Sequence, residues 1–375
     1  MATKAPSGPR SIALVGPFSS GKTTLLENLL FAADAIPRKG SVKEGNMVGD
    51  ASAEARARQM SVEVSAVTFE HMDEMFTVLD CPGSLEFIQE AMDAVVGVDA
   101  AVVVVEPDID RVIALAPIFK FLERHSVPMM LFVNKMDRAE VGVPELLAAL
   151  QEQSERPLVL RQVPIRDGES ITGYIDLVHE RAYQYKPGEA SALIQIPEAM
   201  TDDEQQARTE MLESLADFDD ALLEQLLEDV IPPNDEIHAA LHKDFNEGLL
   251  VPALLGAAEQ ENGVRRLLKA LRHDVPEAAE TAERVGLGDG DEAAVQILKT
   301  YNLPSSGKVS LARVWRGSIG DGASLGGQRI GSINTMSGQA LTKISKAEAG
   351  QIVALGRMDG VKTGQLFSTD EEMDA

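Results

Sequence analysis

The sequence predicts an α/β region, with a doubly wound, mainly parallel sheet and an inserted α+β subdomain, followed by a small all-β barrel domain. Two observations predict the α/β region: short apolar runs recur along the chain, and a segment with helical spacing follows each of them. These runs contain few polar residues, so both faces of the sheet are expected to be buried beneath helices. A third observation predicts the barrel, because strand-like runs separated by glycine-containing turns dominate the last part of the chain.

Four pairs of a strand and a helix begin the α/β region. In chain order they are 12–15 with 23–35, 76–79 with 85–95, 101–105 with 112–124, and 129–133 with 143–151. A strand at 249–255 and a closing helix near 264–271 complete the pattern. We therefore predict one domain over residues 1–277.

An interruption of this pattern predicts the inserted subdomain at about 157–248. Segments 159–165 and 173–177 are predicted strands, and the acidic tract 202–229 is predicted to be helical. A stripe typical of core packing runs along one side of this tract. Its members are Met211, Leu215, Phe218, Leu222 and Leu226.

The composition changes after the α/β region. Residues 278–291 are rich in Ala, Glu, Gly and Asp, which predicts a solvated linker. Residues 292–375 are predicted to form the barrel domain, with strands at 309–316, 323–325, 340–344, 352–355 and 365–368. A helical pattern interrupts these strands only at 345–349.

Charge and composition exclude several classes of protein. The net charge of −26 argues against binding DNA or RNA through a basic face, so no DNA partner is expected. The longest apolar run, 100–105, is too short to cross a bilayer, so no membrane partner is expected either. One cysteine, Cys81, rules out an internal disulfide and a cysteine-cluster metal site, which predicts a reducing, cytoplasmic location.

A glycine-rich loop joins the first predicted strand to the first predicted helix. It reads Gly16-Pro17-Phe18-Ser19-Ser20-Gly21-Lys22-Thr23, and Thr24 follows it. This is the phosphate-binding loop of P-loop NTPases in its required context, where backbone N–H groups and the helix N-terminus hold phosphates. Lys22 is expected to reach the β- and γ-phosphates, and the Thr23 hydroxyl to bind Mg²⁺. A glycine turn that binds no ligand is the alternative.

A second motif, Asp80-Cys81-Pro82-Gly83, follows the predicted strand at 76–79. Asp80 is placed to hold Mg²⁺ through a water, and the N–H of Gly83 to meet the γ-phosphate. The alternative is an ordinary turn, although the position 58 residues after Lys22 favours the nucleotide site. Cys81 is interpreted as a small packed residue.

A third motif, Asn134-Lys135-Met136-Asp137, follows the predicted strand at 129–133 and points to the base. Asp137 can accept hydrogen bonds from N1 and N2 of guanine, whereas adenine offers no such pair of donors, so we predict GTP and GDP as ligands. Asn134 is expected to tie this loop to the phosphate loop, and the Lys135 stem to lie across the purine. A fourth, weaker motif, Gly256-Ala257-Ala258, presents backbone N–H groups to the base oxygen. A charged loop tip and an ordinary loop are the alternatives.

Together these motifs resemble those of translational GTPases, most closely elongation factor G and its paralogues. Further resemblances cover nearly the whole chain: 132–138 in the base loop, Gly40-Ser41-Val42 with Asp50 and Arg58 in the first switch, 173–177 and 248–252 in the insert, and 313–317 and 349–353 in the second domain. The resemblance implies a factor that hydrolyses GTP with Mg²⁺ on the ribosome during translocation or recycling. Lys22, Ser61 and Ser84 would take the catalytic positions, with Thr23, Ser61 and Asp80 around the metal.

The chain departs from the family pattern at several of these positions. Ser84 stands where the family has a His that positions the attacking water, and Pro17 and Ser19 replace a His and an Asp. The first switch reads Arg58-Gln59-Met60-Ser61, where the family usually has Arg-Gly-Ile-Thr. Because a serine hydroxyl is shorter than imidazole and carries no positive charge, nucleotide binding is expected to survive better than catalysis.

Three functions therefore stay open at the level of sequence. The first is a ribosome-dependent GTPase, the second a nucleotide-gated ribosome-binding or regulatory module with little or no hydrolysis, and the third a P-loop protein that binds nothing. The family's later domains are absent after Glu371, so we expect a fragment of a longer protein in preference to a short paralogue.

Overall fold

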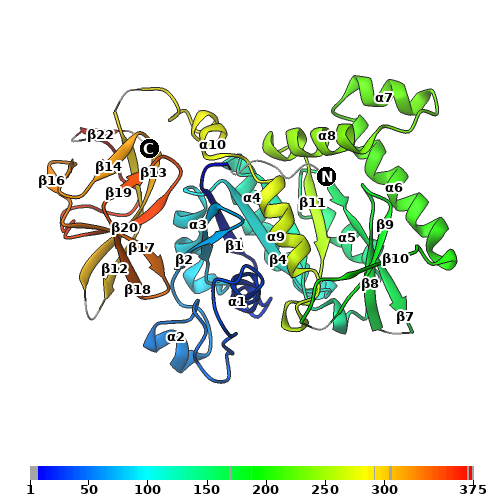
Figure 1. The fold of residues 1–375 in the computed structure, drawn as a ribbon, viewed down its shortest axis with the longest axis horizontal. Helices are drawn as coiled ribbons and strands as arrows, with labels where there is room; N and C mark the ends of the chain where they lie inside the picture. The colour runs from blue at the N-terminus through cyan, green and yellow to red at the C-terminus, as the bar shows by residue number, and fades with distance from the viewer. Residues whose placement is uncertain are drawn as a thin grey trace. The chain divides into compact units, whose positions relative to one another are not determined.

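The computed structural model describes residues 7–168, 170–186, 188–290, 292–303, 306–369 and 371–373. They form two compact units, one of the residues up to Ala101 with those from Pro276 onward, and one of Val102–Val275 (Figure 1). The first unit joins the start of the α/β region to the C-terminal β strands. These units cut across the predicted domains, because the first unit includes residues of both the predicted 1–277 domain and the predicted barrel. Ser337 pairs with Val67, and Arg313 pairs with Asp99, within this unit.

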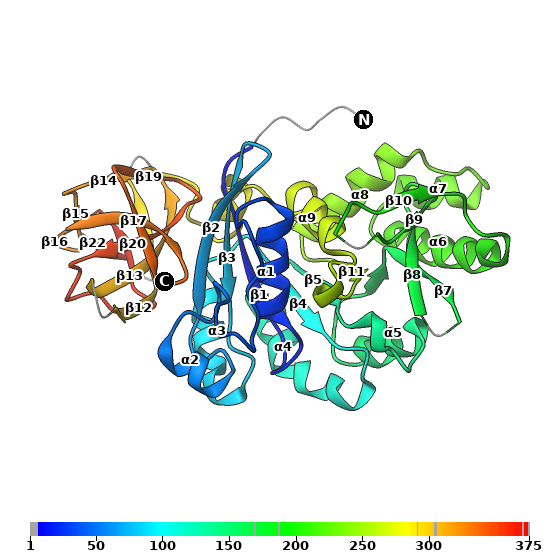
Figure 2. The ribbon, with the colours of Figure 1, turned by 60° about the horizontal axis from the view of Figure 1, so that its bottom comes forward.

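The α/β part of the first unit consists of three strands and the helices between and after them. Its elements are β1 (Arg10–Val15), α1 (Lys22–Ala32), α2 (Ala53–Arg58), β2 (Ser65–His71), β3 (Glu74–Asp80), the short helix η1 (Leu85–Phe87) and α3 (Ile88–Val95). β1 is buried along its whole length, pairs parallel with β3, and is covered by α1 (Figure 2). β2 and β3 pair antiparallel. Because β1 and β3 end at the same edge, the loops after both strands meet there.

The rest of the first unit is an antiparallel β domain. Its strands are β12 (Ala294–Leu303), β13 (Gly307–Arg316), β14 (Ser318–Gly320), β15 (Ser324–Leu325), β16 (Gln328–Arg329), β17 (Ser332–Ser337), β18 (Ala340–Ile344), β19 (Lys346–Glu348), β20 (Ile352–Gly356), β21 (Leu366–Ser368) and β22 (Glu371–Met373). The main order is β22-β21-β12-β13-β20-β17. Inward-facing side chains such as Val295, Val314 and Leu355 form its core.

Two sequence predictions in this unit were wrong. The helical pattern at 345–349 is instead β19, which pairs with β14 and buries Ala347 between two exposed charged residues. The first half of the predicted linker at 278–291 is helix α10 (Ala278–Arg284), whose N-terminus carries a capping box of Glu277 and Glu280. Ala278, Thr281 and Ala282, at helical spacing, bury its inner face.

A buried ion pair joins the two parts of the first unit. The guanidinium of Arg313 on β13 donates to Oδ1 of Asp99 at 2.7 Å, and both side chains are fully buried. The backbone N–H of Ser11 on β1 donates to Oδ2 of the same carboxylate at 2.7 Å. The Tyr301 hydroxyl donates to the carbonyl of Val64 at 2.9 Å. Asp99 thus contacts both β13 and β1, and these contacts fix the β domain to β1. Loss of either partner of the ion pair would leave a buried uncompensated charge.

The second unit contains the remaining parallel strands and the insert. The first set comprises β4 (Ala100–Val105), η2 (Ile109–Leu115), α4 (Ala116–Arg124), β5 (Met129–Val133), η3 (Met136–Arg138), α5 (Val143–Gln151), β6 (Leu158–Leu160), β11 (Val251–Leu255), η5 (Ala258–Gln260) and α9 (Val264–His273). β5 and β6 flank β11, and both pair parallel with it. The loops after β5 and β11 therefore meet at one edge.

The insert pairs a small sheet with three helices, drawn in green in Figure 1. Its elements are β7 (Gln162–Asp167), β8 (Ser170–Asp176), β9 (Arg181–Gln184), β10 (Ala192–Ile194), η4 (Glu198–Met200), α6 (Thr201–Ala216), α7 (Asp220–Leu227) and α8 (Asn234–Asn246). The tract predicted to be helical is two helices, separated where Asp219 caps α7. Met211, Leu215 and Leu222 of the predicted stripe are buried.

The predicted fold class is confirmed by these elements: a mainly parallel sheet with helices, an α+β insert and an all-β region after it. Within the described ranges, no helix has the length and apolar character that crossing a bilayer would require.

Candidate nucleotide-binding site

The phosphate loop lies between β1 and α1. Gly16, Pro17, Phe18, Ser19, Ser20 and Gly21 form the loop, and Lys22, Thr23 and Thr24 form the first turn of α1. Gly16 and Gly21 have φ values of 139° and 90°, which favour glycine because it lacks a Cβ. The buried Lys22 ammonium donates to the carbonyl oxygens of Gly16 and Pro17, each at 3.0 Å. Its positive charge therefore lies within the loop, where phosphate oxygens are expected.

The three side chains predicted to surround the metal lie together in the first unit. The Thr23 hydroxyl donates to Oδ2 of Asp80 at 2.6 Å and lies 3.1 Å from the hydroxyl of Ser61. The Ser61 hydroxyl in turn donates to Oδ1 of Asp50 at 2.8 Å. The cluster thus unites α1, the end of β3 and the segment after α2.

Asp50 is the member of this cluster that the sequence did not place in the site. The resemblance in the first switch includes Asp50 but gives it no role in the site. A single Asp in a loop is not part of a recognisable sequence motif. Only the folded conformation of residues 40–61 brings Asp50 next to Ser61. Burial raises the pKa of Asp50, although the hydrogen bond from Ser61 and the charge of Lys22 oppose this.

A buried oxygen of Asp80 makes the cluster suitable for a cation. The residue is fully buried, and burial raises the pKa of its carboxyl to about 7, although Thr23 and Lys22 oppose the shift. Its Oδ1 atom is buried with no hydrogen-bond partner among the described residues. A divalent cation would supply the missing partner and favour the ionised form, and hydroxyl and carboxylate oxygens are the ligands that Mg²⁺ prefers.

We expect the binding of Mg²⁺ to depend on pH through Asp80. In the metal-free folded state the carboxyl keeps its proton up to about pH 7, whereas the unfolded chain releases it near its ordinary value of 3.8. This group's contribution to stability therefore falls as pH rises from about 4 to about 7, while the metal-binding form becomes populated. Mg²⁺-dependent retention of a fluorescent GDP analogue should require about tenfold more Mg²⁺ at pH 6 than at pH 8.

The Asp80→Asn variant is the control for that titration, because an amide does not ionise in this range. It should bind Mg²⁺ weakly at both pH values and show no such pH dependence. An equally steep dependence in the variant would assign the titration to another group.

The loop after β3 touches the phosphate loop. A Cβ added at Gly83 would lie 2.4 Å from the Lys22 ammonium and 2.6 Å from the carbonyl carbon of Pro17, so only glycine fits there. Ser84 follows, half-buried, and its side chain makes no capping hydrogen bond to η1. Cys81 is fully buried, and burial raises the pKa of its thiol, so its interpretation as a packed residue is confirmed.

The second unit holds the residues predicted to bind the base. Oδ1 of the buried Asn134 accepts from the backbone N–H of Ala258 at 2.8 Å, and the N–H of Met136 donates to the carbonyl of Gly256 at 3.0 Å. These contacts join the loops after β5 and β11. Asp137 is the middle residue of η3, and its Oδ2 accepts from the Gln260 side chain at 3.1 Å.

Two features of this region were not predicted. Glu106, directly after β4, forms ion pairs with Lys135 and Arg111, so it holds the Lys135 stem in place. A single Glu after a strand gives no local signal for this role. Gly256 is required because an added Cβ would lie 2.4 Å from the ring of Phe132. Ala257 and Ala258 follow it, with Ala258 at the start of η5.

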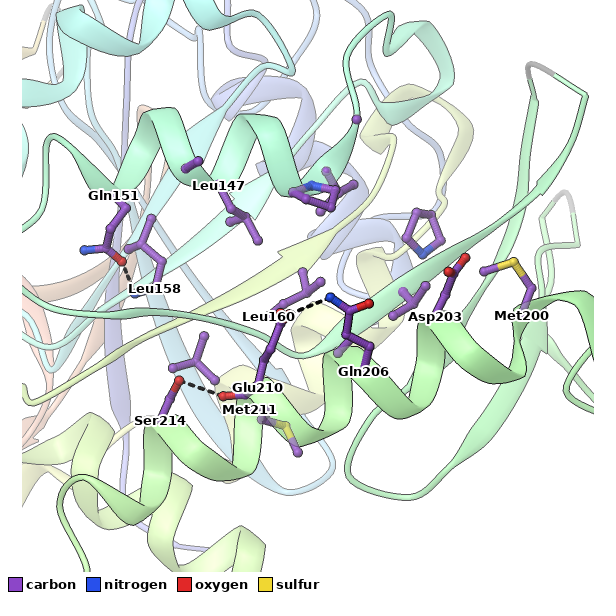
Figure 3. A pocket seen from close by; sticks show the side chains of 18 of the residues that line it. Leu147, Gln151, Leu158, Leu160, Met200, Asp203, Gln206, Glu210, Met211 and Ser214 are labelled. Carbon is purple, nitrogen blue, oxygen red and sulfur yellow. Dashed lines mark hydrogen bonds between the residues drawn. The ribbon is translucent and has the colours of Figure 1, made fainter.

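A cavity of about 600 Å³ also lies in the second unit, and it is separate from these residues (Figure 3). It lies between α5 and α6, where side chains such as Leu147, Leu160 and Met211 line it. The amide of Gln206 donates to Glu210 within the same helix at 3.0 Å. No residue of the predicted nucleotide site lines this cavity, so it is not the nucleotide pocket.

Comparison with known proteins agrees with this geometry. Residues 8–277 match the model of the elongation factor Tu GTP binding domain. The elongation factor G-like protein of Synechocystis sp. is 49% identical over 362 residues, covering 96% of this chain and 54% of that protein. The mitochondrial ribosome-releasing factor 2 of Drosophila erecta is 26% identical, covering 97% of this chain and 52% of that protein.

A crystal structure of a protein from Thermus thermophilus matches with a TM-score of 0.86 and 30% identity, over 97% of this chain and 55% of that one. The chain thus spans about half the length of the relatives it matches.

Proposed function

Since the chain belongs to the elongation factor Tu GTP-binding domain family and is an elongation factor G-like member of the translational GTPases, we propose that it binds GTP and GDP with Mg²⁺ and hydrolyses GTP on the ribosome. The observation that carries this proposal is the convergence of Thr23, Ser61 and Asp80 beside a loop that encloses the Lys22 ammonium. A cytoplasmic location, without DNA or membrane partners, is part of the proposal.

The residues of the first unit suit a triphosphate. Lys22 would exchange its two carbonyl contacts for phosphate oxygens, and the N–H of Gly83 lies next to the same loop. Thr23 and Ser61 would hold Mg²⁺ through their hydroxyls, and Asp80 through a water or directly. When bound, Mg²⁺ supplies positive charge that stabilises the charge on the phosphates. Thr23 already contacts both Ser61 and Asp80, and such preorganised groups lower the barrier to phosphoryl transfer.

The residues of the second unit suit a guanine base. The Asp137 carboxylate would accept from N1 and N2, and the Lys135 stem would cover the ring. The N–H groups of Gly256, Ala257 and Ala258 donate to Val133, Asn262 and Asn134, so this segment would support the base loop and would not donate to the base oxygen. Glu106 supports this by pairing with the Lys135 ammonium, which holds the stem in one direction.

A second candidate function is a nucleotide-gated module with little hydrolysis, and Ser84 favours it. Its neutral hydroxyl is a weak group for positioning water. Release of phosphate over many turnovers, with and without ribosomes, separates the two functions. Stimulated release supports hydrolysis, whereas micromolar GDP binding with release no faster than in buffer supports the gated module.

We expect Ser84→His to raise ribosome-stimulated GTP hydrolysis. Imidazole reaches further than the serine hydroxyl and titrates near neutral pH, so general acid–base positioning predicts a gain of about tenfold to a hundredfold in kcat. Stopped-flow detection of phosphate measures this. GDP affinity should stay unchanged, and Ser84→Asn, which adds bulk without a titrating ring, is the matched control.

An unchanged rate in the Ser84→His protein would mean that water positioning does not limit turnover. The replacements at Pro17 and Ser19 would then be the positions to test.

A further inference from the structure

Two histidines face each other in the insert, and neither is among the residues assigned to the nucleotide. His179 lies in the turn after β8, and His238 lies on α8. Their Nε2 atoms are 3.3 Å apart, and the ring centroids are 4.8 Å apart. Both side chains are partly exposed, so small ions in solution can reach them.

A buried carboxylate fixes the direction of the first ring. Oδ1 of Asp176 lies 3.1 Å from Nδ1 of His179 and accepts from the backbone N–H of the same residue at 3.0 Å. The other oxygen, Oδ2, accepts from Arg266 at 3.1 Å, which keeps the carboxylate charged. A carboxylate facing Nδ1 favours the tautomer with the proton on Nδ1. The lone pair of His179 Nε2 therefore points at His238.

The distance between the two rings matches that of two ligands on one metal ion. In a tetrahedral zinc site, with Zn–N bonds of about 2.0–2.1 Å, two imidazole nitrogens lie about 3.3–3.4 Å apart. Metal-bound histidines commonly donate their second nitrogen to a carboxylate, as His179 can do to Asp176. Imidazole pairs suit Zn²⁺, Cu²⁺ and Ni²⁺ and do not suit Mg²⁺.

We propose that His179 and His238 bind one transition metal ion of the Zn²⁺ class through their Nε2 atoms, with Asp176 orienting His179. No group of three or more His, Cys, Asp or Glu side chains able to hold a metal occurs in the described part of the chain, so water or a small anion completes the coordination. Arg266 pairs with Asp176, and Arg161 lies 3.5 Å from Asp274, so each of these two guanidinium groups has a carboxylate partner. An ion there would link the turn after β8 to α8.

The test is calorimetric titration of the full chain with Zn²⁺ in millimolar Mg²⁺, which occupies oxygen sites and leaves imidazole pairs free. We expect one Zn²⁺ per chain with a dissociation constant below about 100 μM. His179→Gln and His238→Gln should each weaken binding about tenfold or more. His242→Gln is the matched control, because this residue lies one turn further along α8 and faces the carbonyl of Asp274.

A second measurement separates loss of a ligand from loss of the fold. His238→Cys offers a thiolate in place of the imidazole, so it should bind Zn²⁺ more tightly than His238→Gln does, and both variants should keep the far-ultraviolet circular dichroism of the parent. The proposal would be overturned if the parent took up no Zn²⁺ at concentrations up to about 100 μM. It would also be overturned if the parent, His179→Gln, His238→Gln and His242→Gln all bound Zn²⁺ with the same affinity.

Discussion

Replacement of Lys22 by Met lowers the affinity for GTP and GDP by about 10²- to 10³-fold, which is the largest loss we expect from any single change in the phosphate loop. The Lys22 ammonium is buried and donates to the carbonyl oxygens of Gly16 and Pro17, so the loop is shaped around one positive charge. Two hydrogen bonds from a charged donor to phosphate together contribute about 3–4 kcal/mol, which corresponds to that loss.

Methionine keeps the unbranched stem of Lys22, so the loop should retain its packing while losing only the charge. Titration with a fluorescent GDP analogue measures the effect, and the thermal unfolding of the nucleotide-free variant checks the fold. Lys120→Met removes a charge from an exposed position on α4 and should bind GDP as the parent does. An affinity within about threefold of the parent in the Lys22 variant would contradict the assignment of the loop.

The parts of this site that the sequence predicted are those whose chemistry is local. The phosphate loop needs its glycines and lysine in one short segment between a strand and a helix, so the pattern carries its own context. Asp80 and Gly83 were placed in the same way, by their position after a buried strand. That these residues bind GTP stays a prediction, although the structure brings Thr23, Ser61 and Asp80 within hydrogen-bonding distance in series.

The parts that the sequence missed depend on contacts between distant segments. Asp50 and Glu106 are single acidic residues in loops, and their roles appear only when Ser61 and Lys135 are folded against them. Asp99 pairs with Arg313, which lies 214 residues further along the chain. No local sequence pattern therefore predicts that the β domain is fixed to the first strands.

Two secondary-structure errors have a related cause. The acidic composition of 278–291 hid an inner face of small residues at helical spacing in α10. In β19 the alternation of charged and apolar residues covers only three positions, and pairing with β14 decided the structure where local propensity favoured a helix. Short elements therefore follow their tertiary partners, while long apolar elements such as β4 follow their sequence.

The Asp137→Asn variant should lose GTP affinity by about 10²- to 10⁴-fold and gain affinity for xanthosine triphosphate. The change removes a charge that would accept two hydrogen bonds from guanine, worth about 3–5 kcal/mol together, and leaves a donor facing N2. Xanthine carries a carbonyl where guanine carries that amino group, so the new amide donates to it. The loop itself should persist, because the amide oxygen can still accept from Gln260, as Oδ2 of Asp137 does at 3.1 Å.

Competition binding measures this change of preference. GTP and xanthosine triphosphate compete with a fluorescent GDP analogue for the parent, and with a fluorescent xanthosine analogue for the variant. Glu140→Gln, an equal change of charge at an exposed position near the same loop, should leave the preference for guanine intact. The two variants test the base site and the phosphate site separately. If Asp137→Asn keeps the preference for guanine while Lys22→Met still loses affinity, the phosphate site is supported and the base binds elsewhere. If Asp137→Asn instead prefers xanthine and remains as stable as the parent, the Asp137 carboxylate is the group that recognises guanine, because it is the only group that the substitution changes.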